Sequence, residues 1–465
     1  MILTTTSWLE PFIVLFGIGV AVILNSGTNL IFGEISFVTN AAGSILQLAV
    51  SLDYSVFLIH RFQECRTQYD DPKTAMNKAL CKSCSSILSS GLTTVIGFLA
   101  LLFMRFQIGP DLGRALAKGI AISLITVFVF MPGVILLSYR FMDRLSHREF
   151  LPSFRRFGKL VSKITLPLAC IFCLIMVPAY YFSNQNSYYY GSSHIFSAGT
   201  QYGDDTAYIE STFGIKDSYV TSLADMIGPG IPRDMIPDSI KSKLCGTHYN
   251  RLVLSVGVDY EGDETFALVK SLRGKAQKYY GDDYYLAGQG VSTYDLMDTI
   301  TADMGKVNLV AIGAVFVVLL LTMRRLKTPI VLVLAIETAI WINLSLPYLQ
   351  HKPLFYIAYL IISSVQLGAT VDYAILFSDR YHECLKTFTP KESIVEALTQ
   401  TTASILTSSI VMVTVGFLLG FISTHGLLSQ LGYLLGKGTI CSLISVLFVL
   451  PGLLYATTRK KKKER

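Results

Sequence analysis

Two apolar segments, far apart in the chain, each contain an aspartate followed directly by a tyrosine. The pairs are Asp53–Tyr54 in SILQLAVSLDYSVFLIHRFQEC (44–65) and Asp372–Tyr373 in SSVQLGATVDYAILFSDRYHEC (363–384). A carboxylate in the hydrocarbon region of a membrane is costly and rare, so an acid there indicates a function. Burial disfavours its charged form, and a neighbouring phenol can donate to the ionised acid or accept from the protonated one. The two pairs therefore predict a site that takes up and releases protons.

Amide and hydroxyl side chains accompany both pairs at helical spacing. The stripe in the first segment is Gln47, Ser51 and Tyr54, with Asp53 at its flank, and the stripe in the second is Gln366, Thr370 and Tyr373, flanked by Asp372. Residues separated by four and seven positions share one face of a helix. Two such stripes could hold water and pass protons, or they could join helices by hydrogen bonds alone. The aspartate present in both segments favours proton transfer, because amide and hydroxyl side chains alone would suffice to join helices by hydrogen bonds.

Three further charged residues lie in apolar segments. Lys118 and Lys437 correspond to each other and could either pair with the aspartates or extend toward the membrane surface, and both readings stay open. Glu337 has no acidic counterpart and is expected to be an auxiliary proton site or to face a cavity.

The composition is that of a polytopic membrane protein. Of the 465 residues, 52% are hydrophobic and 15% charged, and the mean hydropathy is +0.50. This is too apolar for a soluble globular protein, and a span needs roughly 20 apolar residues. Ten segments qualify, near 10–26, 35–59, 86–104, 111–138, 162–182, 306–322, 329–348, 354–378, 403–423 and 430–457.

The membrane segments form an internal repeat. The two segments that carry the Asp-Tyr pairs align at a constant offset of 319 residues, and LGRALAKGIAISLITVFVFMPGVIL (112–136) matches LGYLLGKGTICSLISVLFVLPGLLY (431–455) at the same offset. SILSSGLTTVIGF (86–98) matches SILTSSIVMVTVGF (404–417). A duplicated membrane unit is typical of secondary transporters. Because Arg61 and Arg380 end matching spans on the same side, the repeats are predicted to be parallel.

The cations indicate how the chain is oriented. The net charge is +7, and the lysines and arginines gather after alternate spans, within 61–82, 140–163, 324–327, 380–391 and 459–465. Positive-inside logic places both termini in the cytoplasm. The basic tail is expected to lie against membrane lipids rather than to bind nucleic acid.

These features predict an all-α membrane bundle of about ten helices with one α/β extracytoplasmic domain. The expected divisions are a first membrane repeat (1–140), a basic cytoplasmic linker (141–161), a span (162–185), the outer domain (186–305), a second membrane repeat (306–458) and a basic tail (459–465). Within the outer domain, RLVLSVGVDYE (251–261) alternates like a strand and ETFALVKSLRGKAQKYY (264–280) is typical of a helix.

No residue set predicts an enzyme, a metal or a cofactor. Cys81 and Cys84 form a single CxxC, whereas structural zinc needs four ligands. Cys245 is alone in the outer domain, so no disulfide is expected there. No nucleophile and base stand in a recognisable arrangement.

The segments LDYSVFLIHRFQE and VDYAILFSDRYHE resemble the Asp-Tyr signature of the MMPL branch of the RND (resistance-nodulation-division) superfamily. The resemblance implies that Asp53–Tyr54 and Asp372–Tyr373 are proton-relay pairs, with each aspartate facing the tyrosine of the other repeat. It also implies a porter-like outer domain and substrates that are lipids, lipid conjugates or hydrophobic drugs. The family's first span, first outer domain and second span have no counterpart here, so we expect a truncated gene product.

The resulting hypothesis is a proton-driven exporter (an H⁺ antiporter) of lipids or other hydrophobic compounds in a bacterial plasma membrane. Its expected partners are protons, membrane lipids and a hydrophobic substrate, and the oligomeric state stays open between a monomer and a homotrimer. Two alternatives from other classes are a non-transporting lipid-sensing or secretion-assisting protein of the same fold and an inactive fragment.

Overall fold

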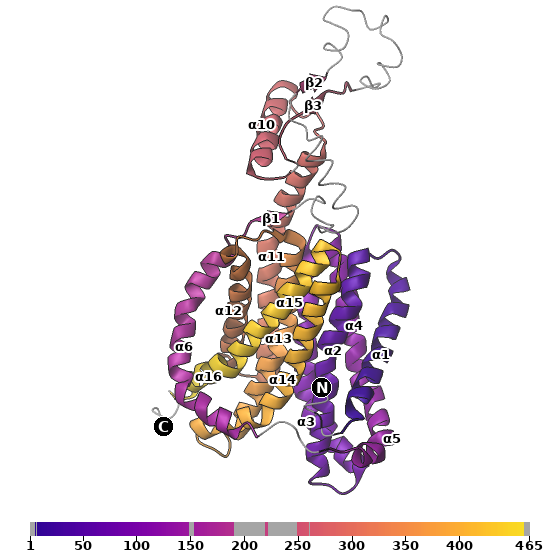
Figure 1. The fold of residues 1–465 in the computed structure, drawn as a ribbon, viewed down its shortest axis with the longest axis vertical. Helices are drawn as coiled ribbons and strands as arrows, with labels where there is room; N and C mark the ends of the chain where they lie inside the picture. Colours follow the sequence, from indigo (N-terminus) through magenta and orange to yellow (C-terminus); the bar gives the residue numbers. More distant parts are fainter. Residues whose placement is uncertain are drawn as a thin grey trace, which may run out of the picture. The chain divides into compact units, whose positions relative to one another are not determined.

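The protein is described by a computed structural model, which covers residues 5, 7–147, 153–189, 219–221, 249–259 and 261–459 (Figure 1). The chain divides into two compact units. The membrane unit comprises Met1–Tyr189 and Asp298–Arg465, and the second unit comprises Tyr190–Met297.

The first half of the membrane unit is a series of long helices joined by short connections. Its elements are α1 (Glu10–Thr28), η1 (Asn29–Phe32), α2 (Phe37–Arg66), α3 (Pro72–Leu99), η2 (Ala100–Phe103), α4 (Ile108–Ile125), η3 (Thr126–Phe130) and α5 (Met131–Arg144). The next helix, α6 (Arg155–Ser183), packs against helices of the second half.

The second half repeats this order. It consists of α11 (Gln289–Met323), which begins in the second unit, then α12 (Lys327–Leu349), β4 (Leu354–Phe355), α13 (Tyr356–Cys384), α14 (Pro390–Ile422), α15 (Gly426–Ile444), η5 (Ser445–Val449) and α16 (Leu450–Arg459). The short strand β1 (Tyr188–Tyr189) pairs in parallel with β4. The elements η3 and η5 are π-helical turns at matching positions of the two halves.

The prediction of ten spans is confirmed. The described residues contain ten helices long and apolar enough to cross a membrane. Several are longer than their apolar cores: α3 begins at Pro72 rather than near residue 86, and α14 begins at Pro390 rather than near residue 403. Hydropathy identifies only the apolar part of a helix, which lies in the hydrocarbon. The polar first turns of these two helices are stabilised instead by Asp71 and Thr389, whose side chains accept hydrogen bonds from the first backbone N–H groups.

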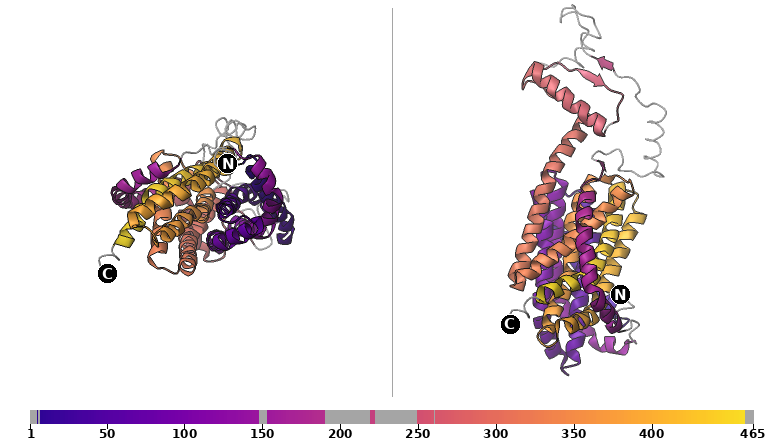
Figure 2. Two further views of the ribbon diagram at one scale, coloured as in Figure 1. Left: turned by 90° about the horizontal axis from the view of Figure 1, so that it is seen from below. Right: turned by 90° about the vertical axis from the view of Figure 1, so that its left-hand side faces the viewer.

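The two halves lie side by side and run in the same direction. Figures 1 and 2 show α1–α5 gathered on one side of the bundle and α12–α16 on the other. The central contact joins α3 to α13, where a Cβ atom on Gly97 would lie 3.5 Å from Cα of Gly368. Arg61 and Arg380 meet each other's neighbouring glutamates at one end of the bundle, which we call the basic end. The matched ends confirm parallel repeats.

Helices α14 and α15 are in backbone contact. A Cβ atom on Gly416 would lie 2.7 Å from the backbone nitrogen of Gly436, and Gly420 and Gly432 meet in the same way. Small residues at such positions let helices approach more closely than side chains otherwise permit.

The described part of the second unit combines strands with helix. β2 (Tyr219–Thr221) pairs antiparallel with β3 (Val253–Ser255), and α10 (Asp263–Tyr280) follows. The strand and helix predicted within 251–261 and 264–280 are therefore present. The rest of the predicted outer domain, within 190–218 and 222–248 and including Cys245, lies outside the described residues, as do 148–152 of the basic linker and 460–465 of the tail.

Candidate functional site

The two Asp-Tyr pairs come together in one small cavity between the halves. It measures about 40 Å³ and is lined by Asp53, Tyr54, Asp372 and Tyr373 with side chains of α2, α3, α13 and α14. A space of ~10–15 Å³ suffices for a water molecule. The central position follows from the repeat, because α2 and α13 are corresponding helices at the contact between the halves. We call this space the aspartate cavity.

Both carboxyl groups are buried and have hydroxyl side chains nearby. Asp372 is 7% exposed and lies near Tyr54 and Ser90, and Asp53 lies near Ser408, but none of the four carboxyl oxygens makes a hydrogen bond of ordinary geometry with a described residue. Leaving a buried polar group unsatisfied is costly, so such groups are exceptions that need an explanation. A buried acid held in this way is the usual setting for proton exchange.

Both tyrosines line the aspartate cavity together with both aspartates, so each tyrosine shares this small space with the aspartate of the other half. The crossed arrangement implied by the family resemblance stays a prediction.

The two tyrosines differ in their other contacts. The Tyr54 hydroxyl donates to Oγ1 of Thr94 at 3.3 Å, and Thr94 donates in turn to the carbonyl of Gly368 in the other half at 2.8 Å. At the matching position of α14 stands Met412, which offers no comparable hydroxyl. The Tyr373 hydroxyl lies near Ser409 of α14 but makes no hydrogen bond of ordinary geometry with a described residue.

The glutamines of the two stripes anchor a hydrogen-bond network that is built twice. In the first half, Asn25 donates to Oε1 of Gln47 at 2.8 Å, and Gln47 donates to the carbonyl of Gly119 at 3.0 Å and to Oγ of Ser123 at 3.2 Å. Ser51 joins the network through Ser123, at 2.7 Å.

The second half repeats the same contacts. Asn343 donates to Oε1 of Gln366 at 2.9 Å, and Gln366 donates to the carbonyl of Gly438 at 3.1 Å and to Oγ of Ser442 at 3.3 Å. Thr370 differs from Ser51, because its hydroxyl donates to the carbonyl of Gln366 in its own helix. Each network joins three helices beside an Asp-Tyr pair. We call these the amide networks.

The asparagines of the amide networks were not among the predicted site residues. Asn25 and Asn343 are separated by 318 residues, one fewer than the offset of the glutamines. The sequence does contain a signal for them, because these two asparagines are a matching pair of polar residues inside apolar spans. A Cβ atom on Gly119 would lie 2.7 Å from Nδ2 of Asn25, so the glycine next to Lys118 makes room for the amide.

Lys118 contacts the end of α1. Its Nζ donates to the carbonyl of Asn25, to Thr28 and to Asn29 at 3.1, 3.0 and 2.6 Å, and lies 4.9 Å from the ring centroid of Phe32. A cation at the C-terminal end of a helix is favourable. Lys437 is half-buried on α15.

Glu337 lies apart from the aspartate cavity. It lines a separate cavity of about 30 Å³ with Asn308, Tyr359 and Ser363. The described residues contain no group of three or more histidine, cysteine, aspartate or glutamate side chains that could hold a metal ion.

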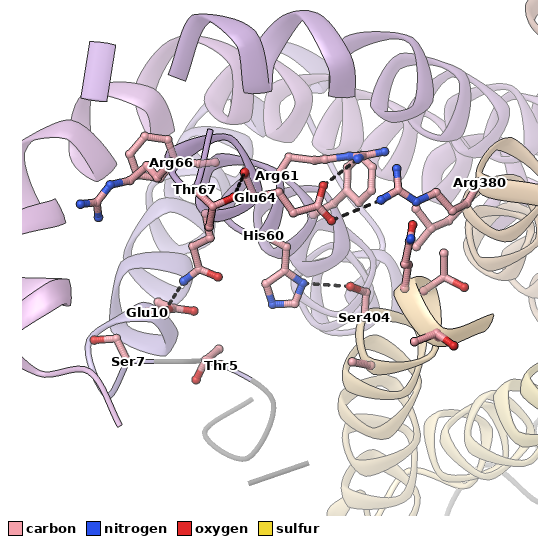
Figure 3. Close-up of a pocket in the computed structure, with 18 of the residues that line it drawn as sticks. Thr5, Ser7, Glu10, His60, Arg61, Glu64, Arg66, Thr67, Arg380 and Ser404 are labelled. Carbon is pink, nitrogen blue, oxygen red and sulfur yellow. Dashed lines mark hydrogen bonds and ion pairs between the residues drawn. The ribbon is translucent and has the colours of Figure 1, made fainter. Parts of the chain in front are cut away.

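At the basic end lies a larger cavity of about 790 Å³, lined by the last turns of α2 and α13, by Ser86 of α3 and by residues 399–404 of α14, together with residues near α1, α5 and α6 (Figure 3). Four charged side chains from matching positions meet here. Arg61 and Arg380 bind the glutamates three residues further on, Glu64 and Glu383, at 2.7 Å each, and cross to the opposite glutamates at 3.9 and 3.6 Å. We call this space the basic-end cavity.

Comparison with known proteins identifies the family. The model of the MMPL family matches residues 1–167 and 249–465, which include both Asp-Tyr pairs, nine of the ten spans and the beginning of the fifth span, Arg155–Ser183. The chain belongs to the MMPL family. The resemblance of the two Asp-Tyr segments to this family is thereby confirmed, and the protein is a multi-pass membrane protein.

Several members of the MMPL family align with parts of this chain. The membrane protein ActII-3 of Streptomyces coelicolor is 22% identical over 402 residues, which cover 79% of this chain and 55% of ActII-3. The siderophore exporter MmpL5 of Mycobacterium tuberculosis is 32% identical over 115 residues, which cover 25% of this chain and 12% of MmpL5.

The solved structure of SecDF, a translocon-associated membrane protein from Thermus thermophilus, has a similar fold. The TM-score is 0.65 at 16% sequence identity, and the superposition covers 97% of this chain and 59% of SecDF. In each of these three comparisons the match covers less than two thirds of the other protein.

Proposed function

We propose that this MMPL protein is a proton-driven exporter in which Asp53–Tyr373 and Asp372–Tyr54 relay protons between the two halves. The observation that carries the proposal is the aspartate cavity, where two buried carboxyl groups from matching positions share one small space and none of their oxygens makes a hydrogen bond of ordinary geometry with a described residue. A fixed structural role would be expected to provide such groups with partners.

The membership of the MMPL family supports a transporter role. The position of the acids supports proton coupling, because one aspartate comes from each half and a proton can therefore pass between the two repeats. One elementary charge crossing the membrane releases about 2.3 kcal/mol per 100 mV, enough to drive a hydrophobic molecule against a modest gradient.

We infer that the basic end faces the cytoplasm. Arg61, Arg66, Arg380 and the cations at 324–327 lie at or near the ends of spans on this side, in agreement with positive-inside logic. The opposite end, where α6 leads toward residues 190–288, then faces outward. We propose a bacterial plasma membrane as the location, with both termini in the cytoplasm.

Lipids or other hydrophobic compounds are the proposed substrates. This proposal is supported by the family and by the name of its member MmpL5, a siderophore exporter.

Proton flux through the purified protein tests the relay. The full chain is reconstituted in liposomes that contain a pH-sensitive dye, and a potassium diffusion potential is imposed. Asp53→Asn and Asp372→Asn are expected to reduce proton flux to the level of empty liposomes. Asp70→Asn, which changes an exposed acid next to α3, is the matched control and should leave the flux unchanged.

Export is tested separately with a hydrophobic dye. Cells that produce the chain are loaded with Nile red, and its efflux is followed with and without an uncoupler. Efflux that requires both the membrane potential and Asp53 supports the proposal. Proton flux and dye efflux that are equal in the wild type and in Asp53→Asn would instead favour a non-transporting lipid-sensing or secretion-assisting protein of the same fold.

A further inference from the structure

The aspartate cavity and the basic-end cavity adjoin at four shared residues. Both are lined by Phe57, Ser86, Leu376 and Ser404. Phe57 matches Leu376 and Ser86 matches Ser404 in the internal repeat, so each half contributes one apolar side chain and one hydroxyl. Of these four side chains, only the serines can donate or accept a hydrogen bond. We call the four residues the neck.

Each serine of the neck is hydrogen-bonded to a titratable residue of the other half. Nδ1 of His60 on α2 lies 2.9 Å from Oγ of Ser404 on α14, and Figure 3 shows the imidazole directed toward this serine. Ser86 on α3 donates to Oδ2 of Asp379 on α13 at 2.8 Å. His60 and Asp379 both line the basic-end cavity.

His60 and Asp379 occupy the same position in the two halves. Each follows its relay aspartate by seven residues, which is two turns along the same face of a helix. The repeat therefore places an imidazole and a carboxyl group at the one point where the neck meets the larger cavity. The charged groups around them are Arg61 and Glu64 on α2 and Arg380 and Glu383 on α13.

We propose that His60 and Asp379 are the residues through which the relay aspartates exchange protons with the basic-end cavity, and that Ser404 and Ser86 carry each proton across the neck. The inference rests on the proposed function, because it assigns a route to protons that Asp53 and Asp372 would bind. It adds two titratable residues and two hydroxyls to the four residues of the relay.

The transfer balances with water as the only further participant. Among the described residues no hydrogen bond joins a relay aspartate to a serine of the neck, so the proton crosses the aspartate cavity on a water molecule, for which ~10–15 Å³ suffices. That water gives a proton to a lone pair of Ser404 Oγ while Ser404 gives its own hydroxyl proton to Nδ1 of His60. The hydroxyl is restored and the imidazole becomes an imidazolium, which then releases one proton to water in the basic-end cavity. On the other side, Ser86 gives its proton to the Asp379 carboxylate as it receives one, and the resulting carboxylic acid releases that proton to water.

A purely structural role predicts something different. Hydrogen bonds from His60 and Asp379 across the halves could serve only to hold α2 to α14 and α13 to α3. In that case any polar side chain that preserves the contact would suffice, and no small molecule could replace the imidazole. Proton transfer, in contrast, requires a group that binds and releases a proton, wherever it comes from.

The first experiment removes the hydroxyls of the neck. Proton flux is measured in liposomes for the double variant Ser86→Ala/Ser404→Ala, for Ser86→Thr/Ser404→Thr, which keeps both hydroxyls, and for Ser138→Ala. Ser138 lies on α5 and bonds only to the carbonyls of Val134 and Ile135 in its own helix. We expect the double alanine variant, the alanine pair, to slow the proton flux about tenfold or more, because a positioned proton donor or acceptor contributes about 10²–10⁴-fold to a rate. The double threonine variant and Ser138→Ala should retain the wild-type flux.

The second experiment replaces the imidazole chemically. His60→Ala should slow the flux, and added imidazole, which fits in a cavity of about 790 Å³, should restore it. Asp53→Asn with imidazole gives the background, because imidazole also carries protons across lipid. Rescue of His60→Ala above this background supports proton transfer at His60.

The two experiments separate the inference from the proposed function. If the alanine pair keeps wild-type flux while Asp53→Asn loses it, the neck route is wrong and the relay stands. If His60→Ala is slow but imidazole does not help, His60 has only a structural role and the inference is overturned. If Asp53→Asn keeps its flux, the proposed function itself fails.

Discussion

The hydroxyl of Tyr54 donates a hydrogen bond to Oγ1 of Thr94, and through Thr94 it is tied to the carbonyl of Gly368 in the opposite half. Tyr373, its counterpart, has no such tie among the described residues. Tyr54 is thus tied to the other half through Thr94, whereas the hydroxyl of Tyr373 lies near Ser409 of its own half. The asymmetry arises from a single difference of residue type, threonine in α3 against methionine in α14.

Thr94→Val is expected to destabilise the contact between the halves. The substitution preserves shape but removes the hydrogen bond to the buried hydroxyl of Tyr54 and the bond that joins Thr94 to the carbonyl of Gly368, which costs about 1–3 kcal/mol. Thermal unfolding in detergent measures the loss. Thr93→Val is the matched control: Thr93 is equally buried, yet its hydroxyl bonds only to the carbonyl of Ser90 in its own helix. Equal melting temperatures for the two variants would contradict this account.

Gly438→Ala should disrupt the amide network of the second half. The added methyl group would collide with the side-chain amides of Gln366 and Asn343, and overpacking of this kind costs about 1–3 kcal/mol. Gly133→Ala is the control, because nothing lies within 4 Å of a Cβ atom at Gly133, and alanine should favour α5 there. Chemical unfolding in detergent measures the stability of both variants. A Gly438→Ala protein as stable as the wild type would show that the amide network rearranges to accept the methyl group without loss of stability.

Arg105→Ala should weaken the attachment of α11 to the first half. The Asp303 side chain is 2% exposed and accepts from the backbone nitrogen and from Nε of Arg105 at 2.7 and 2.8 Å. Removing the guanidinium leaves a buried carboxylate with only the backbone donor, so we expect a loss of about 1–3 kcal/mol. Arg114→Ala, at an exposed arginine bonded to Pro110 of its own helix, should have little effect on the melting temperature.

The start of α3 should fray in acid. Hydrogen bonds from the side chain and the backbone nitrogen of Thr74 lower the pKa of Asp71 below its ordinary value of 3.8. Because the folded pKa is depressed, the contribution of the cap is present above pH 3.8 and is lost as the pH falls through the lower folded value. Hydrogen exchange at the amide of Thr74 should therefore accelerate in strong acid. Asp71→Ala should exchange rapidly already at neutral pH, whereas Asp70→Ala should behave as the wild type.

Hydropathy and the internal repeat were sufficient to predict the ten spans and their parallel arrangement, and the two Asp-Tyr segments were sufficient to indicate the family. These features depend on many residues at once, so single exceptions do not obscure them. The helix ends were harder to predict. Caps such as Asp71 and Thr389 extend helices beyond the apolar stretch, and α11 begins at Gln289, well before the apolar segment near 306–322.

The contacts around the aspartates depend on single side chains, and there the sequence was less informative. His60 and Asp379 match in position but differ in type, so a search for identical residues in the two halves passes over them. Thr94 has no polar counterpart at all. Lys118 was left between two readings because its partners, Asn25, Thr28 and Asn29, lie in a span distant in sequence. The roles of Asp53, Tyr54, Asp372 and Tyr373 stay predictions until proton flux is measured.

The backbone contact of α14 with α15 has a mechanical consequence. At these glycines no side chain separates the two backbones, so a tilt of α14 toward α15 brings backbone against backbone. Ser404 and Ser408 of α14 line the aspartate cavity, and Gly438 and Ser442 of α15 hold Gln366. We therefore expect a displacement of α14 at the neck to reach the amide network of the second half through α15.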